Sequence, residues 1–167
     1  MQSPDVQIRQ LASADAFVYR ECRLEALRSS PEAFGSTYEQ EYPQTLDWFA
    51  DRLRSSDMFG AFRGAELMGI AGLLVGKGLK EKHKGLLVSM FVRGAARKMG
   101  LGRRLAEAVM EHARARVELI QLSVVSENEA AIRLYQDLGF VEYGREKKAL
   151  KQGGRYYDEI WMARDLS

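Results

Sequence analysis

The chain has 167 residues, 46% of them hydrophobic, and a formal net charge of +2 from 25 Lys and Arg against 23 Asp and Glu. A chain of this size and composition fits one ordinary globular domain that buries roughly two thirds of its unfolded surface. The charge balance argues against a general nucleic-acid binder, and the lack of any apolar run near ~18 residues argues against a membrane protein. We therefore treat residues 1–167 as a single domain.

The single cysteine and the N-terminal residues indicate the cellular compartment that we expect for this protein. Cys22 has no second cysteine with which to form an internal disulfide, which favours a reducing environment. It falls in a predicted amphipathic helix with no histidine nearby in sequence, so we interpret it as a buried structural residue. No basic-then-apolar signal opens the sequence, and we expect a cytoplasmic protein. His83 has no neighbouring histidine or cysteine, so no metal site is predicted.

The N-terminal part predicts a strand and then a helix. Residues 6–11 alternate well enough for a strand, and Ser13 or Asp15 can cap a helix that runs to about Ser29. Residues 32–39 read as a connection that is rich in aromatic and acidic side chains. Long connections are often functional, although core filling by the aromatic residues is the simpler interpretation.

A second helix and a hairpin follow. The helix is expected from about 45 to 55. Two apolar segments, 58–62 and 67–75, are joined by Arg-Gly-Ala-Glu at 63–66, which is a hairpin signal. Residues 77–84 are mostly Lys and Gly and predict a solvated loop.

The most informative stretch is a strand, a basic glycine turn and a helix start. Residues 86–92 form an apolar run broken only by Ser89, which suits a central strand, and Arg97–Gly102 follows where a helix should begin. A helix start leaves about four N–H groups free and carries roughly half a positive charge, so it can bind an anion. We expect phosphate; the alternative is that Gly100 and Gly102 only shape a tight turn beside a basic face.

Two common phosphate motifs are absent from the sequence. No string matches the P-loop pattern of Gly, four residues, Gly, Lys and Ser or Thr. A dinucleotide fingerprint would need a third glycine at position 105, where this chain has Leu105. Neither nucleotide-binding fold is supported.

The C-terminal part predicts a further strand and helix. Residues 118–125 are β-rich, and the helical crossover from the central strand implies a parallel pair. Ser126 and Glu129 have capping-box spacing, and Gly139 is a typical helix stop. Tyr135 lies on the apolar stripe of this helix.

Two closing strands, 140–145 and 156–162, complete the pattern. The predicted fold class is mixed α/β (α+β), with a central mixed, mostly antiparallel sheet flanked by about four helices.

At two places the chain resembles the GNAT superfamily of N-acetyltransferases. The family's acetyl-CoA signature consists of Arg or Gln, any two residues, Gly, any one residue, and then Gly or Ala. It begins five residues after the last valine of a strand. In this chain Val92 and Arg97–Gly102 match the signature. A second family pattern is matched by Asn128, Tyr135 and Gly139–Phe140. The resemblance implies a single GNAT-like domain whose parallel strand pair is splayed at a cofactor cleft.

The resemblance also implies site residues, with acetyl-CoA as co-substrate. Tyr135 would be the catalytic acid that protonates the coenzyme A thiolate, unless it is only a core residue. Asn128 would bind the cofactor arm near its thiol, unless it only makes a hydrogen bond at the helix start. The implied cofactor-binding residues are Met90, Phe91, Val92, Arg97, Lys98, Met99, Gly100, Leu101, Gly102, Arg103 and Asn128.

The implied reaction is direct transfer of the acetyl group to a primary amine of a small molecule or peptide in a ternary complex. The alternative is a non-catalytic acyl-CoA-binding or regulatory module of the same fold. Candidates for the base that deprotonates the amine are Glu39, Ser89 through water, and Glu159. We expect no nucleic-acid or membrane partner; dimers are common in the family, so a homodimer is one expectation.

The sequence does not decide the chemical class of the acceptor, because two segments of opposite charge favour different amines. Phe34, Tyr38, Glu39 and Glu41 would suit a small cationic amine, whereas the basic residues between 147 and 156 would suit an acidic one such as an amino acid. A peptide N-terminus is also open.

Overall fold

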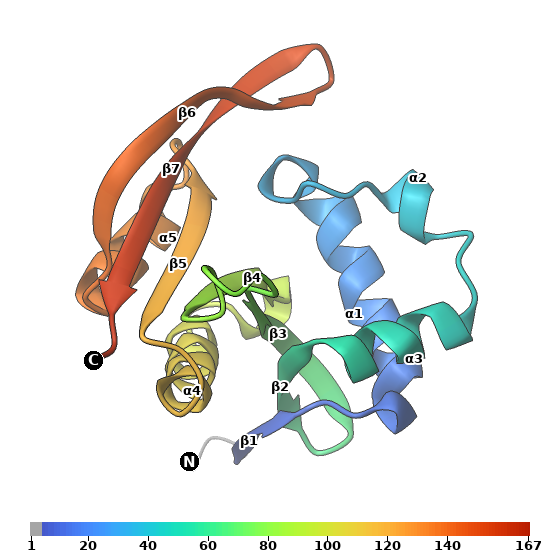
Figure 1. Ribbon diagram of the computed structural model, residues 1–167. Coiled ribbons are helices and arrows are strands. Elements are labelled where there is room, and N and C mark those ends of the chain that lie inside the picture. The colour runs from blue at the N-terminus through green and yellow to red at the C-terminus, as the bar shows by residue number, and fades with distance from the viewer. Residues whose placement is uncertain (1–4) are drawn as a thin grey trace.

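The computed structural model describes residues 5–167, which form one seven-stranded sheet with helices on both faces (Figure 1). The strands are β1 (Val6–Gln10), β2 (Asp57–Arg63), β3 (Glu66–Val75), β4 (Lys84–Val92), β5 (Leu119–Val125), β6 (Val141–Gln152) and β7 (Arg155–Asp165). The α-helices are α1 (Ala16–Ser29), α2 (Tyr38–Glu41), α3 (Leu46–Ser55), α4 (Leu101–Arg114) and α5 (Glu129–Asp137). Short 3-10 turns lie at Ser13–Asp15, Pro31–Ala33 and Gly94–Ala96.

The sheet is mixed, with strand order β1-β2-β3-β4-β5-β7-β6. Among the described strands only the β4–β5 pair is parallel, and it is short: residues 84–86 pair with residues 119–121. Beyond this point β5 remains paired with β7 and β4 with β3, while β4 and β5 part from each other (Figure 1). The predicted mixed, mostly antiparallel sheet with a splayed parallel pair is therefore confirmed.

Two apolar cores hold the helices to the sheet. Helices α4 and α5 cover one face, where Leu105 and Val109 of α4 are fully buried and α4 packs mainly on β3 and β4. Helices α1 and α3 cover the other face, where Tyr19 packs edge-to-face on Phe49 with 6.1 Å between ring centroids. Cys22 belongs to this second core and is buried, as interpreted from the sequence.

A bulge bends β4 at the level where it leaves β5. The β3–β4 register shifts between Ile70 and Gly72, and Ser89 has a positive φ of 58°. A bulge of this kind puts an extra residue into one strand and increases its local bend. Ser89 and Met90 are thereby placed at the opening between the two diverging strands.

The predicted start of α5 was wrong, whereas that of α1 was right in position, since Asp15 is its N-cap residue. The N-cap of α5 is Asn128, because the Ser126 amide still donates to Asp158 O at 2.9 Å and so belongs to the strand ladder. Neither Ser13 nor Asp15 caps α1 with its side chain, since the Asp15 carboxylate binds Arg9 and the Ala12 amide instead. The predicted start of α3 was correct: Thr45 Oγ1 accepts from the Trp48 amide at 3.1 Å.

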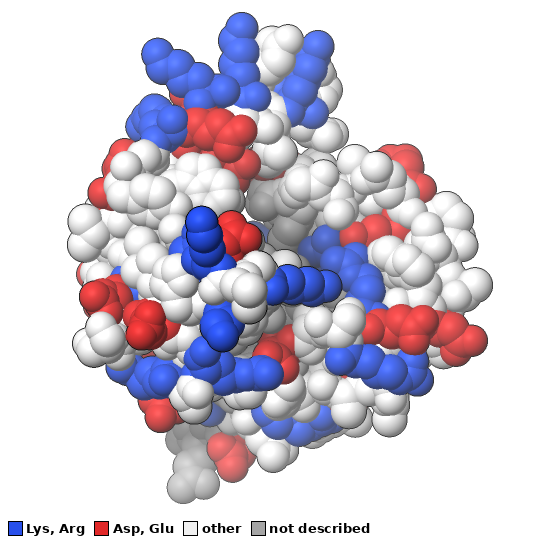
Figure 2. Space-filling view, in the orientation of Figure 1, with Lys and Arg blue, Asp and Glu red and all other residues white. Residues whose placement is uncertain are grey.

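The last two strands are longer than predicted. They were expected over 140–145 and 156–162, but β6 and β7 form a hairpin that continues to the turn at 153–154. Nearly all of β6 is exposed, so it lacks the alternation that marks a half-buried strand. Figure 2 shows Lys and Arg side chains gathered at the tip of this hairpin.

None of the helices within residues 5–167 has both the length and the apolar character needed to cross a membrane. In the same part of the chain, no group of three or more His, Cys, Asp and Glu side chains is placed to hold a metal ion.

Candidate active site

A groove of about 880 Å³ lies between the open edge of β4, the turn before α4 and helix α5. Of the predicted site residues, those that line it are Met90, Phe91, Val92, Arg97, Lys98, Gly100, Leu101, Gly102, Arg103, Asn128 and Tyr135. Met99 does not line it; this side chain is 38% exposed. One continuous surface therefore joins two motifs that lie more than 25 residues apart in the chain.

The turn before α4 has the backbone of an anion site. Lys98 and Gly100 both have positive φ, 67° and 74°, and Gly100 is the N-cap of α4. The first helical hydrogen bond runs from the Arg104 amide to Gly100 O at 3.2 Å. The amides of residues 101–103 therefore have no partner within the helix and lie at its positive end. Alternating backbone of this kind concentrates N–H groups in a concave cradle.

Side chains around this turn add charge and leave space. Arg97 Nε donates to Val92 O at 3.2 Å, which holds the guanidinium beside the end of β4. At Gly102, a Cβ would lie 3.5 Å from Leu134 Cδ2 and 3.9 Å from Val92 Cγ2, so a larger side chain would fill the floor of the groove. The turn therefore fits a phosphate group in both charge and shape.

A second cavity of about 400 Å³ lies where β4 and β5 part. Met90, Asn128 and Tyr135 line both this cavity and the groove, together with Phe34 and neighbouring residues. Two spaces therefore meet at Tyr135: a long groove that ends at the turn before α4, and a smaller cavity bounded by α1, β4, β5 and β7. We call the smaller one the acceptor cavity.

Tyr135 is both a core residue and a cavity residue. It is 5% exposed and packs edge-to-face on Phe140 with 5.8 Å between ring centroids. Burial raises the pKa of its hydroxyl above the ordinary value of 10, so the phenol is protonated at neutral pH. It is therefore a proton donor placed at the junction of the two spaces.

Asn128 combines the two roles considered for it. Its Oδ1 accepts from the Ala131 amide at 3.1 Å, so it does cap α5. It also lines both cavities. Because Oδ1 faces the helix, the NH₂ group of the same amide is the part left to donate elsewhere.

The three candidate bases are separated by the fold. Ser89 and Glu159 both line the acceptor cavity, Ser89 from the bulge in β4 and Glu159 from β7. Glu39 is exposed on α2 and lines neither the groove nor the acceptor cavity. Only Ser89 and Glu159 are therefore placed near Tyr135.

A buried ion-pair cluster beside the acceptor cavity was missed from the sequence. Arg23 Nε and Nη2 each donate to the Glu41 carboxylate at 3.0 Å, and Arg52 Nη1 donates to the same carboxylate at 2.9 Å. Desolvation opposes the ionised form, but the hydrogen bonds and charges of the two arginines outweigh it, so the pKa of Glu41 is lowered. Glu41, 3% exposed, cannot serve as the free anion expected for a cationic amine.

One sequence signal could have revealed Arg23. It lies on the face of α1 that carries Tyr19, Cys22, Ala26 and Leu27, all buried. A charged residue in the middle of an apolar helix stripe is a mismatch that calls for a buried partner. The identity of that partner, Glu41, depends on the packing of α2 on α1.

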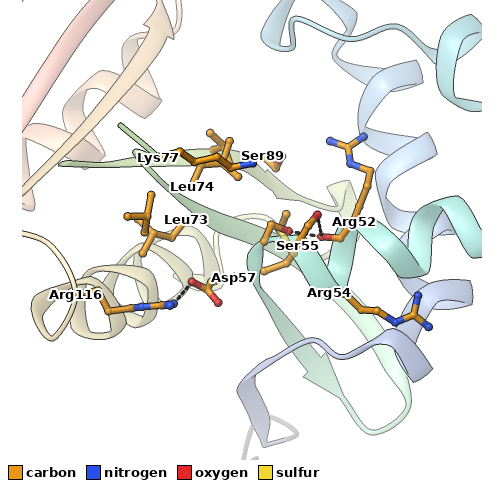
Figure 3. Close-up of a pocket in the computed structure, with 13 residues that line it drawn as sticks. Arg52, Arg54, Ser55, Asp57, Leu73, Leu74, Lys77, Ser89 and Arg116 are labelled. Atoms are coloured by element: carbon orange, nitrogen blue, oxygen red, sulfur yellow. Dashed lines mark hydrogen bonds and ion pairs between the residues drawn. The ribbon is translucent and has the colours of Figure 1, made fainter. Parts of the chain in front are cut away.

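A third cavity, of about 700 Å³, shares the lining residues Val88 and Ser89 with the acceptor cavity. Figure 3 shows Arg52 from α3, Lys77 and Ser89 around it, with the Arg116–Asp57 ion pair at its edge. Arg52 thus contacts Glu41 on one side and lines this third cavity on the other.

The described chain is an α/β protein with a seven-stranded sheet, a splayed parallel strand pair and a groove that ends at a helix start. Residues 22–140, well over half of the chain, match the model of the Acetyltransferase (GNAT) family. The chain therefore belongs to that family. None of the curated proteins matches it in sequence.

Solved structures share the fold over nearly the whole chain. A GNAT-family acetyltransferase of Streptococcus pneumoniae superposes with a TM-score of 0.86 at 22% identity, covering 98% of this chain and 100% of that one. The yncA protein of Salmonella typhimurium, solved with its cofactor acetyl-CoA, has a TM-score of 0.81 at 21% identity, with 98% and 95% covered. The ribosomal-protein-alanine N-acetyltransferase of Brucella melitensis has a TM-score of 0.78 at 24% identity, with 95% and 99% covered.

Proposed function

We propose that this protein is an N-acetyltransferase that moves the acetyl group of acetyl-CoA to a primary amine by direct transfer in a ternary complex. The observation that carries the proposal is the meeting of the long groove and the acceptor cavity at Tyr135. Two substrates that enter from the two spaces would meet beside a protonated phenol, so no covalent enzyme intermediate is needed.

The groove suits a coenzyme A thioester along its length. The amides of residues 101–103 and the Arg97 side chain would hold the pyrophosphate. In the part of the chain that the structure describes, the edge of β4 beyond residue 86 has no strand partner on the β5 side, so Met90 to Val92 can hydrogen-bond the pantetheine arm through their backbone. The NH₂ group of Asn128 would donate to the arm near its thiol end.

Proton movement would use groups of the acceptor cavity. An alkylammonium has a pKa near ~10, so its proton must be removed before the nitrogen attacks the thioester carbonyl. Glu159, or Ser89 through water, would accept that proton. Tyr135 would donate its hydroxyl proton to the thiolate as it leaves, and the same burial that raises the pKa of the phenol also makes a thiolate there more basic.

A free-thiol release assay with acetyl-CoA and a panel of amines tests the proposal. Thiol release that depends on both substrates, together with a product heavier by one acetyl group, is the expected result. Saturable acetyl-CoA binding with no amine-dependent release would instead indicate a non-catalytic acyl-CoA-binding module.

Replacing Arg97 by Ala should weaken acetyl-CoA binding by about 10-fold, because one charge-assisted contact to the pyrophosphate is lost. Titration calorimetry with acetyl-CoA and with an acetyl-pantetheine lacking phosphates separates the effects. Binding of the phosphate-free analogue should be nearly unchanged. An equal loss of affinity for both ligands would mean that Arg97 stabilises the structure of the groove and does not bind phosphate.

A further inference from the structure

We infer that the acceptor carries a carboxylate close to its amine, as an α-amino acid does, and that Arg23 binds this carboxylate. The inference rests on the proposed acetyl transfer and names the chemical class of the second substrate. It depends on three observations: the position of Arg23, the charge of its cluster, and the charged lining of the acceptor cavity.

Arg23 is a buried guanidinium at the wall of the acceptor cavity. It is 4% exposed, and α1 brings it against Phe34, whose ring centroid lies 5.3 Å from Cζ. Its Nε and Nη2 are occupied by the two oxygens of Glu41. Among residues 5–167, the only hydrogen-bond partner of Nη1 is Ser89 Oγ, at 3.4 Å, which is a long hydrogen bond. The edge of the guanidinium that does not face Glu41 is therefore available to an oxygen of a ligand.

The cluster carries one more positive than negative charge. A single carboxylate, Glu41, serves both Arg23 and Arg52. The Arg52 side chain is 35% exposed and is partly balanced by solvent, whereas Arg23 is not. An uncompensated charge in a buried site is costly, and an anion in the acceptor cavity would offset that cost.

Among the described residues, the acceptor cavity is lined by only two charged side chains, Arg23 and Glu159. They come from opposite sides of the opening, Arg23 from α1 and Glu159 from β7. A zwitterion fits this pair, with its carboxylate on Arg23 and its amine toward Glu159 and Tyr135. A simple cationic amine would leave the excess positive charge of the Arg23–Glu41–Arg52 cluster unbalanced, and an internal peptide amide carries no charge to balance it.

The first experiment uses matched acceptors and the unmodified protein. Each of a set of L-α-amino acids is compared with its primary amide and with its decarboxylated amine in the acetyl-CoA thiol-release assay. The free acid should have a kcat/KM about 10- to 100-fold above that of its amide, as expected for one charge-assisted hydrogen bond in a buried site. Equal or better use of the amides or amines would overturn the inference while leaving the proposed function intact.

The second experiment uses Arg23→Gln with Arg20→Gln as the matched control. Arg20 lies on the same helix and pairs with Glu21, away from the three cavities. Arg23→Gln should remove the preference for the acid over the amide, mainly through KM, and keep its affinity for acetyl-CoA. Arg20→Gln should keep the preference. A preference that survives in Arg23→Gln would contradict the inference, and Arg23→Lys gives a milder variant if the glutamine variant does not fold.

A binding experiment with N-acetyl amino acids, which keep the carboxylate but have no free amine, tests this inference separately from the proposed function. In the presence of coenzyme A, N-acetyl amino acids should bind the unmodified protein, and Arg23→Gln should bind them about 10-fold more weakly. Such binding without any acetyl transfer would support the carboxylate site and refute the transferase. Neither binding nor transfer would refute both.

Discussion

Replacing Tyr135 by Phe should lower kcat by about 100-fold or more and leave the affinity for acetyl-CoA within about 2-fold, in line with the loss of one general acid. The ring would remain, so its edge-to-face contact with Phe140 and its place in the core would be kept. Only the hydroxyl at the junction of the groove and the acceptor cavity would be removed. Steady-state kinetics with calorimetric acetyl-CoA binding on the same preparations measures both quantities.

The control for this variant is Tyr143→Phe. Tyr143 lies on exposed β6, where its hydroxyl accepts from Gln121 Nε2 at 3.1 Å, and it lines neither the groove nor the acceptor cavity. This variant should retain full turnover. If Tyr135→Phe lost acetyl-CoA affinity and turnover to the same extent, the tyrosine would be structural and another group would protonate the thiolate.

Replacing Glu41 by Gln should lower the free energy of unfolding by about 3–5 kcal/mol, the usual cost of removing one partner from a buried ion pair. Glutamine has nearly the same shape, but it leaves Arg23 with no charged partner in a buried position. Urea denaturation at pH 7 measures the difference. Glu39→Gln, an exposed change on the same short helix, is the matched control and should shift stability by about 0.5 kcal/mol or less.

The effect of Glu41→Gln should also depend on pH. The pKa of Glu41 is lower in the folded protein than its ordinary value of 4.5. A group of this kind stabilises the fold at pH values above its unfolded pKa, and the contribution is lost as the pH falls through the folded pKa. The stability gap between the unmodified protein and Glu41→Gln should therefore be full at neutral pH and shrink in acid below about 4.5. A gap that is independent of pH would mean that packing and not charge carries the effect.

Local patterns in the sequence were reliable where neighbouring residues decide the structure. The helix start within Arg97–Gly102 depends on the conformational freedom of glycine and on the missing partners of first-turn amides, and both act within a few residues. The left-handed stop at Gly139, with φ of 89°, is of the same kind. The predicted helix start at Ser126 was wrong because the Ser126 amide donates to Asp158 O in β7, which is distant in sequence. No local sequence pattern indicates such a hydrogen bond.

Exposed and long-range features were the ones that the sequence did not predict. The β6–β7 hairpin leaves most of β6 in solvent, so the apolar alternation on which strand prediction relies is absent. The Arg23–Glu41 pair joins residues 18 positions apart on two helices whose contact is set by tertiary packing. The acidic connection was consequently interpreted as a surface for a cationic amine, although one of its carboxylates is buried and neutralised by arginine.

The sequence by itself determined the glycine-rich helix start, the amphipathic helix that carries Tyr135, and the parallel crossover between β4 and β5, because each depends on periodicity or on turn chemistry within one segment. The splayed pair was expected from the family resemblance, but only the tertiary structure decided where β4 and β5 separate, which is after three paired residues. That separation lets the groove meet the acceptor cavity at Tyr135 and sets Arg23 opposite Glu159. Strand divergence and buried charge pairing are properties of packed elements, so they exist only once the chain has folded.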